Sequence, residues 1–256
     1  MFRIATWNVN SIRVRLQHIL SWIEKEIPDV LALQETKIID EDFPIDVFNE
    51  IGYQAIYSGQ KTFNGVATLS KATPSNIISG IPGFDDPQKR VLCAEIGKIT
   101  VLNLYVPNGS EVGSDKYNYK LKWFSRLQGF VKNLLVDKKN LIILGDFNIA
   151  PEDQDVHDPV AWEGNVLVSE AERDEFRKLL AAGLTDCFRL FEQEEKSYSW
   201  WDYRAAAFRR NNGLRIDHIL ASQSLASMCR SCRIDKEPRA LERPSDHVPV
   251  IAEFDI

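Results

Sequence analysis

Carboxylate, amide and imidazole side chains recur in this chain at the ends of short apolar runs. Asn8 and Asn10 follow the first apolar run, and Glu35 follows the second. The same residue types return beside or within later runs: Tyr105, Asn108, Asp146, Asn148, Asp217, His218, Asp246 and His247. If the predicted strands end at one edge of their sheets, these side chains form a single acidic, oxygen-rich cleft.

A cleft of this composition favours one kind of chemistry. Carboxylate and amide oxygens, without cysteine or repeated histidine, favour Mg²⁺ or Mn²⁺ over zinc. Mg²⁺ uses few protein carboxylates and leaves positions for water and phosphate oxygens. An imidazole beside a carboxylate can hold a phosphate or carry a proton. Phosphoryl transfer needs these parts, so the residue types predict metal-dependent phosphoester chemistry.

Each of these residues also has an ordinary structural explanation. Aspartate, asparagine and glycine are common turn formers, and a turn is the simpler explanation for Asn10 or Asp158 taken alone. Tyr105 can be a strand aromatic with its hydroxyl at the surface, and Trp200 can belong to the core. The set as a whole favours an active site, but spacing alone leaves both explanations open.

The elements that must position these residues follow from the hydrophobic pattern. A strand is predicted from Phe2 towards Asn8, followed by a helix whose apolar residues begin at Leu16 and end before Pro28. The strands on either side of Gly97 are expected to pair as a hairpin. Because strands outnumber helices and several links are short, the pattern predicts an α/β sandwich with helices outside. Further strands are predicted at 30–33, 54–59, 65–70, 91–96, 99–106, 141–145, 215–221 and 248–254, and further helices at 116–136 and 169–182.

The composition excludes several classes of protein. The chain has 256 residues, of which 44% are hydrophobic and 27% charged, so it is not disordered, collagenous or a coiled coil. No repeat or linker-like tract interrupts residues 1–256, and one continuous domain is expected. The formal net charge of -6 argues against binding nucleic acid by bulk charge, although it does not say where the charges sit.

The sequence also bears on cellular location. No apolar run reaches the roughly 18 residues of a membrane span, and the N-terminus lacks the apolar stretch of a signal peptide. Four cysteines are too few for a disulfide framework, and the pair Cys229 and Cys232 has no second pair at zinc-site spacing. We therefore expect plain thiols and a cytoplasmic protein with no membrane partner.

Seven stretches carry a resemblance to known proteins. They are, in order along the chain, ATWNVNSIR at 5–13, LQETK at 33–37, NLYVPNG at 103–109, GDFNIAP at 145–151, YSWWDYR at 198–204, GLRID at 213–217 and SDHVP at 245–249. Together and in this order they resemble the exonuclease III family of apurinic/apyrimidinic endonucleases, which belongs to the endonuclease/exonuclease/phosphatase superfamily that includes deoxyribonuclease I. The resemblance covers essentially the whole chain and implies a four-layered α/β sandwich of two packed mixed sheets flanked by helices.

The resemblance implies a Mg²⁺ site, in which Mn²⁺ could substitute. Glu35 is similar to the family's main metal carboxylate, with Asn8 and Asp246 near the same ion. Asn10 stands where some members carry aspartate, which implies a weaker metal site. The sequence leaves open whether a second metal is held by Asp146, Asn148 and His247.

The resemblance also implies the roles in hydrolysis. Asp146 is similar to the base that orients or deprotonates the attacking water, and Asn148 to the amide that holds the phosphate. His247 matches the imidazole that contacts the scissile phosphate, and Asp217 matches the carboxylate that holds that imidazole. Tyr105 resembles the tyrosine beside the phosphate and the leaving group.

Other residues are expected to bind the substrate. Trp200 and Leu214 match positions that line a pocket for a base-less deoxyribose, which an apolar wall accepts more readily than a base. The segment 203–215 carries several arginines and no acid, which is typical of a phosphate-contacting loop. Asn10, Arg13, Asn108 and Arg204 are expected substrate contacts, and Arg15, Lys37, Lys89, Arg90, Lys116 and Lys120 could extend that contact.

The sequence therefore predicts a monomeric, Mg²⁺-dependent DNA repair nuclease of the exodeoxyribonuclease III type. It would cleave the phosphodiester 5′ to abasic sites and trim 3′ ends of duplex DNA in base excision repair. The segments 108–110 and 153–170 depart from the family pattern, so the balance of the two activities is not predicted. One alternative is a phosphoesterase acting on a small-molecule or lipid phosphodiester, which would not need the Trp200 pocket. The other is a DNA-binding module without catalysis.

Overall fold

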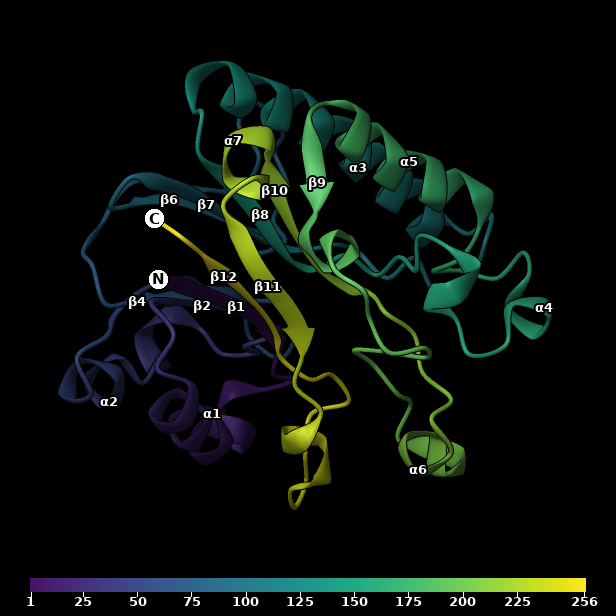
Figure 1. Ribbon diagram of the computed structural model, residues 1–256, viewed down its shortest axis with the longest axis horizontal. Helices are drawn as coiled ribbons and strands as arrows, with labels where there is room; N and C mark the ends of the chain where they lie inside the picture. The colour runs from purple at the N-terminus through teal and green to yellow at the C-terminus, as the bar shows by residue number, and fades with distance from the viewer.

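Two six-stranded sheets form the centre of the molecule, which we describe from a computed structural model of residues 1–256 (Figure 1). Both sheets are mixed, because β1 pairs in parallel with β2 and β7 with β8, whereas the other pairs are antiparallel. The first sheet contains, in spatial order, β11 (Cys229–Ile234), β12 (Val250–Phe254), β1 (Phe2–Asn8), β2 (Val30–Gln34), β4 (Val66–Ser70) and β3 (Gln54–Ser58). The second contains β5 (Pro74–Ser79), β6 (Val91–Ile96), β7 (Ile99–Tyr105), β8 (Leu141–Asp146), β10 (Asp217–Ser222) and β9 (Leu184–Asp186).

Helices cover the outer face of each sheet, which gives four layers (Figure 1). The helices α1 and α2 lie against the first sheet, and α3 and α5 lie against the second. The predicted four-layered α/β sandwich is therefore confirmed, and none of the helices combines the length and apolarity needed to cross a bilayer. The helices are α1 (Ile12–Glu26), α2 (Ile45–Glu50), α3 (Asp115–Asp137), α4 (Pro159–Trp162), α5 (Glu170–Ala181), α6 (Ala207–Arg210) and α7 (Gln223–Ala226).

Strand β8 shows why the layers form. Its apolar residues point alternately to opposite faces of the sheet, as the pleat requires. Ile142 and Leu144 pack between the two sheets, whereas Leu141 and Ile143 pack under the helices. Because both faces are buried, the strand is a continuous apolar run up to its end at Gly145 and Asp146.

Most predicted elements are present, and the exceptions have physical reasons. The hairpin around Gly97 is confirmed by the pairing of Ile96 with Ile99. Strand β5 was not predicted because it is an exposed edge strand with an irregular register. Strand β11 was not predicted because its cysteine, arginine and serine residues give little apolar pattern. The predicted strand 215–221 begins two residues late, because the amides of Arg215 and Ile216 bond to Asp155 and Ser199 instead of to a neighbouring strand.

The register of the strands brings their polar ends to one edge. In the second sheet, Asp146 lies opposite Tyr105 on β7 and opposite Asp217 on β10. In the first sheet, Asn8 at the end of β1 lies opposite Gln34, which immediately precedes Glu35. The predicted convergence of these side chains is therefore a direct consequence of strand pairing.

Candidate active site

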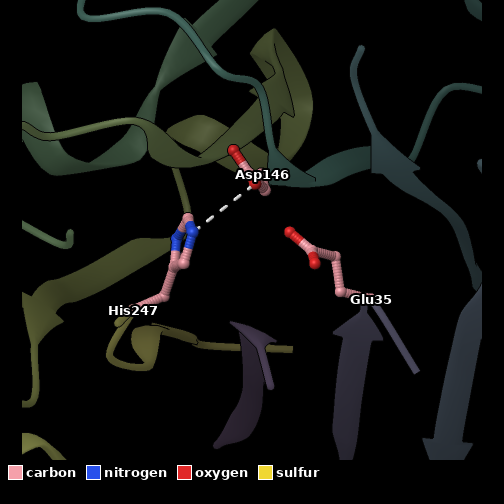
Figure 2. A group of neighbouring side chains, drawn as sticks. All are labelled: Glu35, Asp146 and His247. Atoms are coloured by element: carbon pink, nitrogen blue, oxygen red, sulfur yellow. Dashed lines mark ion pairs between the residues drawn. The ribbon is translucent and has the colours of Figure 1, made fainter. Parts of the chain in front are cut away.

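Glu35, Asp146 and His247 form the centre of this edge, with one ligand atom of each lying within 4.8 Å of the others. Glu35 and His247 come from loops of the first sheet, and Asp146 ends β8 of the second, so the cluster bridges the two sheets (Figure 2). Two carboxylates held this close repel each other unless a cation lies between them. The two carboxylates fit a divalent metal ion, and the imidazole lies beside them.

Glu35 is held by three neighbours. Asn8 Nδ2 donates to its Oε1 over 2.9 Å, Tyr105 Oη donates to the same oxygen over 2.9 Å, and Lys37 Nζ lies 2.7 Å from Oε2. Burial favours the protonated acid, but the charge of Lys37 and the Asn8 bond dominate and lower the pKa of Glu35. The carboxylate is therefore charged at neutral pH and can serve as a metal ligand.

Asp146 is the most buried carboxylate of the cluster. Burial raises its pKa to about 7, although the nearby charge of His247 opposes this effect. Asn8 Nδ2 donates to its Oδ2 over 2.9 Å, and the main-chain N–H of Asn148 donates to its Oδ1 over 2.9 Å. Gly145 makes this arrangement possible, because a Cβ at that position would lie 1.9 Å from the carbonyl oxygen of Leu104. A carboxylate with a pKa near neutrality is suited to accept a proton from water.

His247 lies between two carboxylates. Its Nδ1 is 2.9 Å from Asp217 Oδ2 and its Nε2 is 3.7 Å from Asp146 Oδ2. Burial alone disfavours the charged ring, but Asp217 and Asp146 outweigh it and raise the pKa of His247 to about 10. Ser199 Oγ donates to the same Asp217 oxygen over 2.7 Å. The imidazole is thus held in one orientation as a cation, which suits contact with a phosphate.

Asn148 and Asn108 extend the site along the second sheet. Asn148 has a φ of 49°, a left-handed conformation that asparagine tolerates better than most residues. Its Nδ2 donates to Asp146 Oδ2 over 3.2 Å and to the carbonyl of Val106 over 3.0 Å. Asn108 Nδ2 donates to Asn148 Oδ1 over 3.1 Å. The two amides are therefore adjacent.

Asp246 lies next to the cluster and is held by a tryptophan. Trp200 Nε1 donates to Asp246 Oδ2 over 3.0 Å, and Asn10 Nδ2 donates to Oδ1 over 3.0 Å. Lys37 also donates to Asn10 Oδ1, over 2.5 Å, which links this group back to Glu35. The main chain of Trp200 forms isolated β-bridges with Leu214 and with His247, so Trp200 lies beside the cluster. Leu214, the other residue of the predicted wall, is 0% exposed and packs in a buried apolar cluster.

Several predicted contacts lie outside the hydrogen-bonded cluster. The guanidinium of Arg13 pairs with Asp42 on the surface, and that of Arg204 pairs with Asp202. Two expectations were wrong. Arg215 is not a loop arginine that contacts phosphate, because it is 1% exposed and pairs with Asp155 and Asp186. Lys120 is not a surface cation either, because its side chain is 0% exposed.

Two residues near the site, Ser199 and Tyr203, were not singled out from the sequence. Ser199 donates to Asp217, and Tyr203 Oη accepts from Asn10 Nδ2 over 3.2 Å while donating to the carbonyl of Pro244 over 2.8 Å. Both lie in the stretch 198–204, which the resemblance already marked. The signal for them was therefore present in the motif, although their partners depend on the fold.

Known proteins are similar to this chain over nearly its whole length. The endonuclease/exonuclease/phosphatase family model matches residues 5–247. Exodeoxyribonuclease III of Haemophilus influenzae is 38% identical over 265 residues, which cover 98% of this chain and 99% of that protein. The exodeoxyribonuclease of Bacillus subtilis is 35% identical over 97% of both chains.

Two solved structures are also similar over their full lengths. The 3′ phosphatase NExo from Neisseria, bound to a product DNA hairpin, superposes with a TM-score of 0.98 at 45% identity over 100% of both chains. An AP endonuclease from Archaeoglobus fulgidus superposes with a TM-score of 0.97 at 40% identity over 100% of both chains. The chain therefore belongs to the endonuclease/exonuclease/phosphatase family, in its exonuclease III branch.

Proposed function

We propose that this chain is a Mg²⁺-dependent DNA repair nuclease that cleaves 5′ to abasic sites and trims 3′ ends of duplex DNA in base excision repair. The observation that carries the proposal is the cluster of Glu35, Asp146 and His247, with Asp217 behind the imidazole. The relatives named exodeoxyribonuclease III and AP endonuclease support the same activity.

Glu35 would hold the ion, with Asn8 and Asp246 beside it. An oxygen-rich donor set fits a hard cation, and its negative charges need one to offset their mutual repulsion. A bound Mg²⁺ would polarise the phosphoryl oxygens and offset the charge that develops on them.

The attacking water would be oriented by Asp146. A pKa of about 7 lets this carboxylate take a proton from water near neutral pH. Charged His247 would donate to the phosphate oxygens, and Asn148 Nδ2 would do so by exchanging its contact with Asp146 for one with the phosphate. The pKa of Tyr105 is well above its usual value because of burial and the nearby carboxylates, so its hydroxyl remains a neutral donor.

Substrate selection would depend on the wall beside the cluster and on the arginine loop. Trp200 adjoins His247 and Asp246, where an extruded base-less sugar would contact its ring. Exposed Arg209 and Arg210 lie on α6, at the tip of a loop that projects from the body (Figure 1). Phosphate contacts there would orient the duplex. We also propose a monomer, because the candidate site needs no residue from a second copy.

The test compares two 5′-labelled duplexes, one with an internal abasic site and one intact with a recessed 3′ end. The proposal expects Mg²⁺-dependent incision 5′ to the abasic site, leaving a 3′ hydroxyl that a polymerase extends, and stepwise shortening of the intact strand. A small chromogenic phosphodiester serves as the competing substrate. Hydrolysis of that compound with no action on either duplex would support the phosphoesterase alternative instead.

A further inference from the structure

Lys120 lies in the protein interior, behind the two loops that carry Asn108 and Asn148. It belongs to α3, and its side chain is 0% exposed. An ammonium group loses its hydration when it is buried, so a wholly buried lysine needs partners for each of its N–H groups. Burial lowers the pKa of Lys120, and the charges of Glu172 and Asp146 oppose that effect.

The ammonium has three N–H groups, and three acceptor oxygens lie around it. Lys120 Nζ lies 2.7 Å from the carbonyl oxygen of Asn148, 3.1 Å from that of Asn108 and 2.5 Å from Glu172 Oε1. Two of the three acceptors are therefore main-chain oxygens of the active-site loops. If Lys120 served only as an ion pair between α3 and α5, it would need only the third acceptor, Glu172 Oε1.

These carbonyls belong to Asn108 and Asn148, whose side chains lie in the part of the site that we propose contacts the phosphate. Asn148 has a φ of 49°, and its side-chain amide contacts Asp146 on one side and Asn108 on the other. The main chain at Asn148 is fixed from behind by Lys120 and from the front by the bond of its N–H to Asp146. The direction in which the Asn148 side-chain amide points therefore depends on both contacts, the one with Lys120 and the one with Asp146.

Glu172 extends the same network to the neighbouring segment. Its Oε1 also accepts the N–H of Leu167 over 3.1 Å, and its Oε2 accepts from Ser169 Oγ over 2.6 Å. Gly109 packs directly on the lysine, because a Cβ there would lie 3.3 Å from Lys120 Cδ. The buried ammonium thus joins three loops at the rear of the site.

We propose that Lys120 is a positioning residue for phosphodiester hydrolysis, whose ammonium fixes the main chain of Asn108 and Asn148 so that the Asn148 amide faces the phosphate. The inference rests on the proposed function, because the rate that it concerns is the hydrolysis of DNA. Lys120 itself does not contact the substrate.

The first test compares Lys120→Met with Lys122→Met, which makes the same substitution at an exposed position of the same helix. Loss of a transition-state donor typically costs about 10² to 10³ in kcat, and a misdirected donor costs less. We expect Lys120→Met to lower kcat on abasic duplex by about 10- to 100-fold with KM within about threefold. Lys122→Met should match the wild type.

The second test asks whether the effect passes through Asn148. Asn148→Ala, Lys120→Met and the double variant form a thermodynamic cycle on kcat. If Lys120 acts by orienting the Asn148 amide, Lys120→Met lowers kcat little further once that amide is gone. Losses that multiply in the double variant would overturn the inference, and so would an unchanged kcat in folded Lys120→Met.

Folding is followed by thermal unfolding of each variant. If Lys120→Met fails to fold because Glu172 is left unpaired, the cycle is run with Lys120→Met combined with Glu172→Gln, which removes both charges. The single variant Glu172→Gln keeps the lysine N–H groups on both carbonyls and should lose less kcat than that combination. An equal loss would overturn the role of the carbonyl contacts. A wild type that cleaves no DNA would instead refute the proposed function and the inference with it.

Discussion

His247 and Asp217 join the two sheets at the active-site edge, with Nδ1 of the imidazole 2.9 Å from Oδ2 of the carboxylate. His247 lies just before β12 of the first sheet, and Asp217 begins β10 of the second. Ser199 donates to the same carboxylate oxygen, which fixes the carboxylate in turn. The charge of His247 therefore depends on how the sheets pack and not on its own loop alone.

Asp217→Asn removes the charge that stabilises the imidazolium while keeping the shape of the side chain. Replacing a group that orients another typically costs about 10- to 100-fold, and we expect a loss of that size in kcat. The pKa of His247 should fall from about 10 towards its ordinary value of 6.5. The cation is the form that binds phosphate, so the basic limb of the kcat/KM profile should move to lower pH. If the basic limb of the profile stays at the same pH in Asp217→Asn, the role assigned to Asp217 is contradicted.

Trp200 has two functions that two substitutions separate. Trp200→Phe removes the N–H donor to Asp246 and keeps an aromatic wall, whereas Trp200→Ala removes both. We expect the phenylalanine variant to need more Mg²⁺ but to keep its preference for an abasic over an intact duplex. The alanine variant should lose that preference, measured as a ratio of kcat/KM values. An unchanged ratio in the alanine variant would contradict the role of the Trp200 ring in selecting abasic sites.

The exposed arginines of α6 should set the salt dependence of DNA binding. Each phosphate contact contributes about 0.9 to the slope of log K against log salt, so removing Arg209 and Arg210 together should reduce the slope by about 2. Binding is measured in EDTA to prevent cleavage. Arg177→Ala on α5 is the control, because its guanidinium already pairs with Glu170 and Asp174. Equal slopes in all three proteins would exclude the loop from the DNA contact.

His218 should make folding sensitive to acid. Burial, together with the charge of Arg215, lowers its pKa from 6.5 to about 4. Between these values the unfolded chain binds the proton and the folded chain does not. The stabilisation is therefore complete above about pH 6.5 and lost as the pH falls towards 4, by up to about 3 kcal/mol.

His218→Gln tests this prediction because it removes the titrating group. The free energy of unfolding is measured in urea at several pH values for both proteins, and the difference between them cancels the other groups. That difference should shrink as the pH falls from 6.5 to 4.5. A difference that stays constant would show that His218 is not the titrating group.

Much of the fold follows from local patterns in the sequence. The apolar run that forms β8 and the hairpin at Gly97 depend on neighbours in the chain, and both are found where they were expected. The edge strand β5 is exposed and irregular, so it leaves little apolar signal.

Some features of the candidate site could likewise be predicted from the sequence, and others could not. The motif residues that were expected to converge do so because strand register fixes the ends of β7, β8 and β10. The locations of Lys120 and Arg215 could not be predicted, because a cation in a sequence looks the same whether it faces solvent or a buried carboxylate. Their partners, Glu172 and Asp155, lie 52 and 60 residues away in the chain.

The central claim is that a metal held at Glu35, with Asp146 beside it as the base for the attacking water, drives cleavage of damaged DNA. Its most direct test is incision of a 5′-labelled abasic duplex by the wild type and Asp146→Asn, each with Mg²⁺ and with EDTA. We predict incision by the wild type that EDTA abolishes and added Mg²⁺ restores, and a loss of about 10² to 10⁴ in kcat for Asp146→Asn with duplex binding retained. Cleavage that is indifferent to EDTA, or undiminished in Asp146→Asn, would contradict the claim.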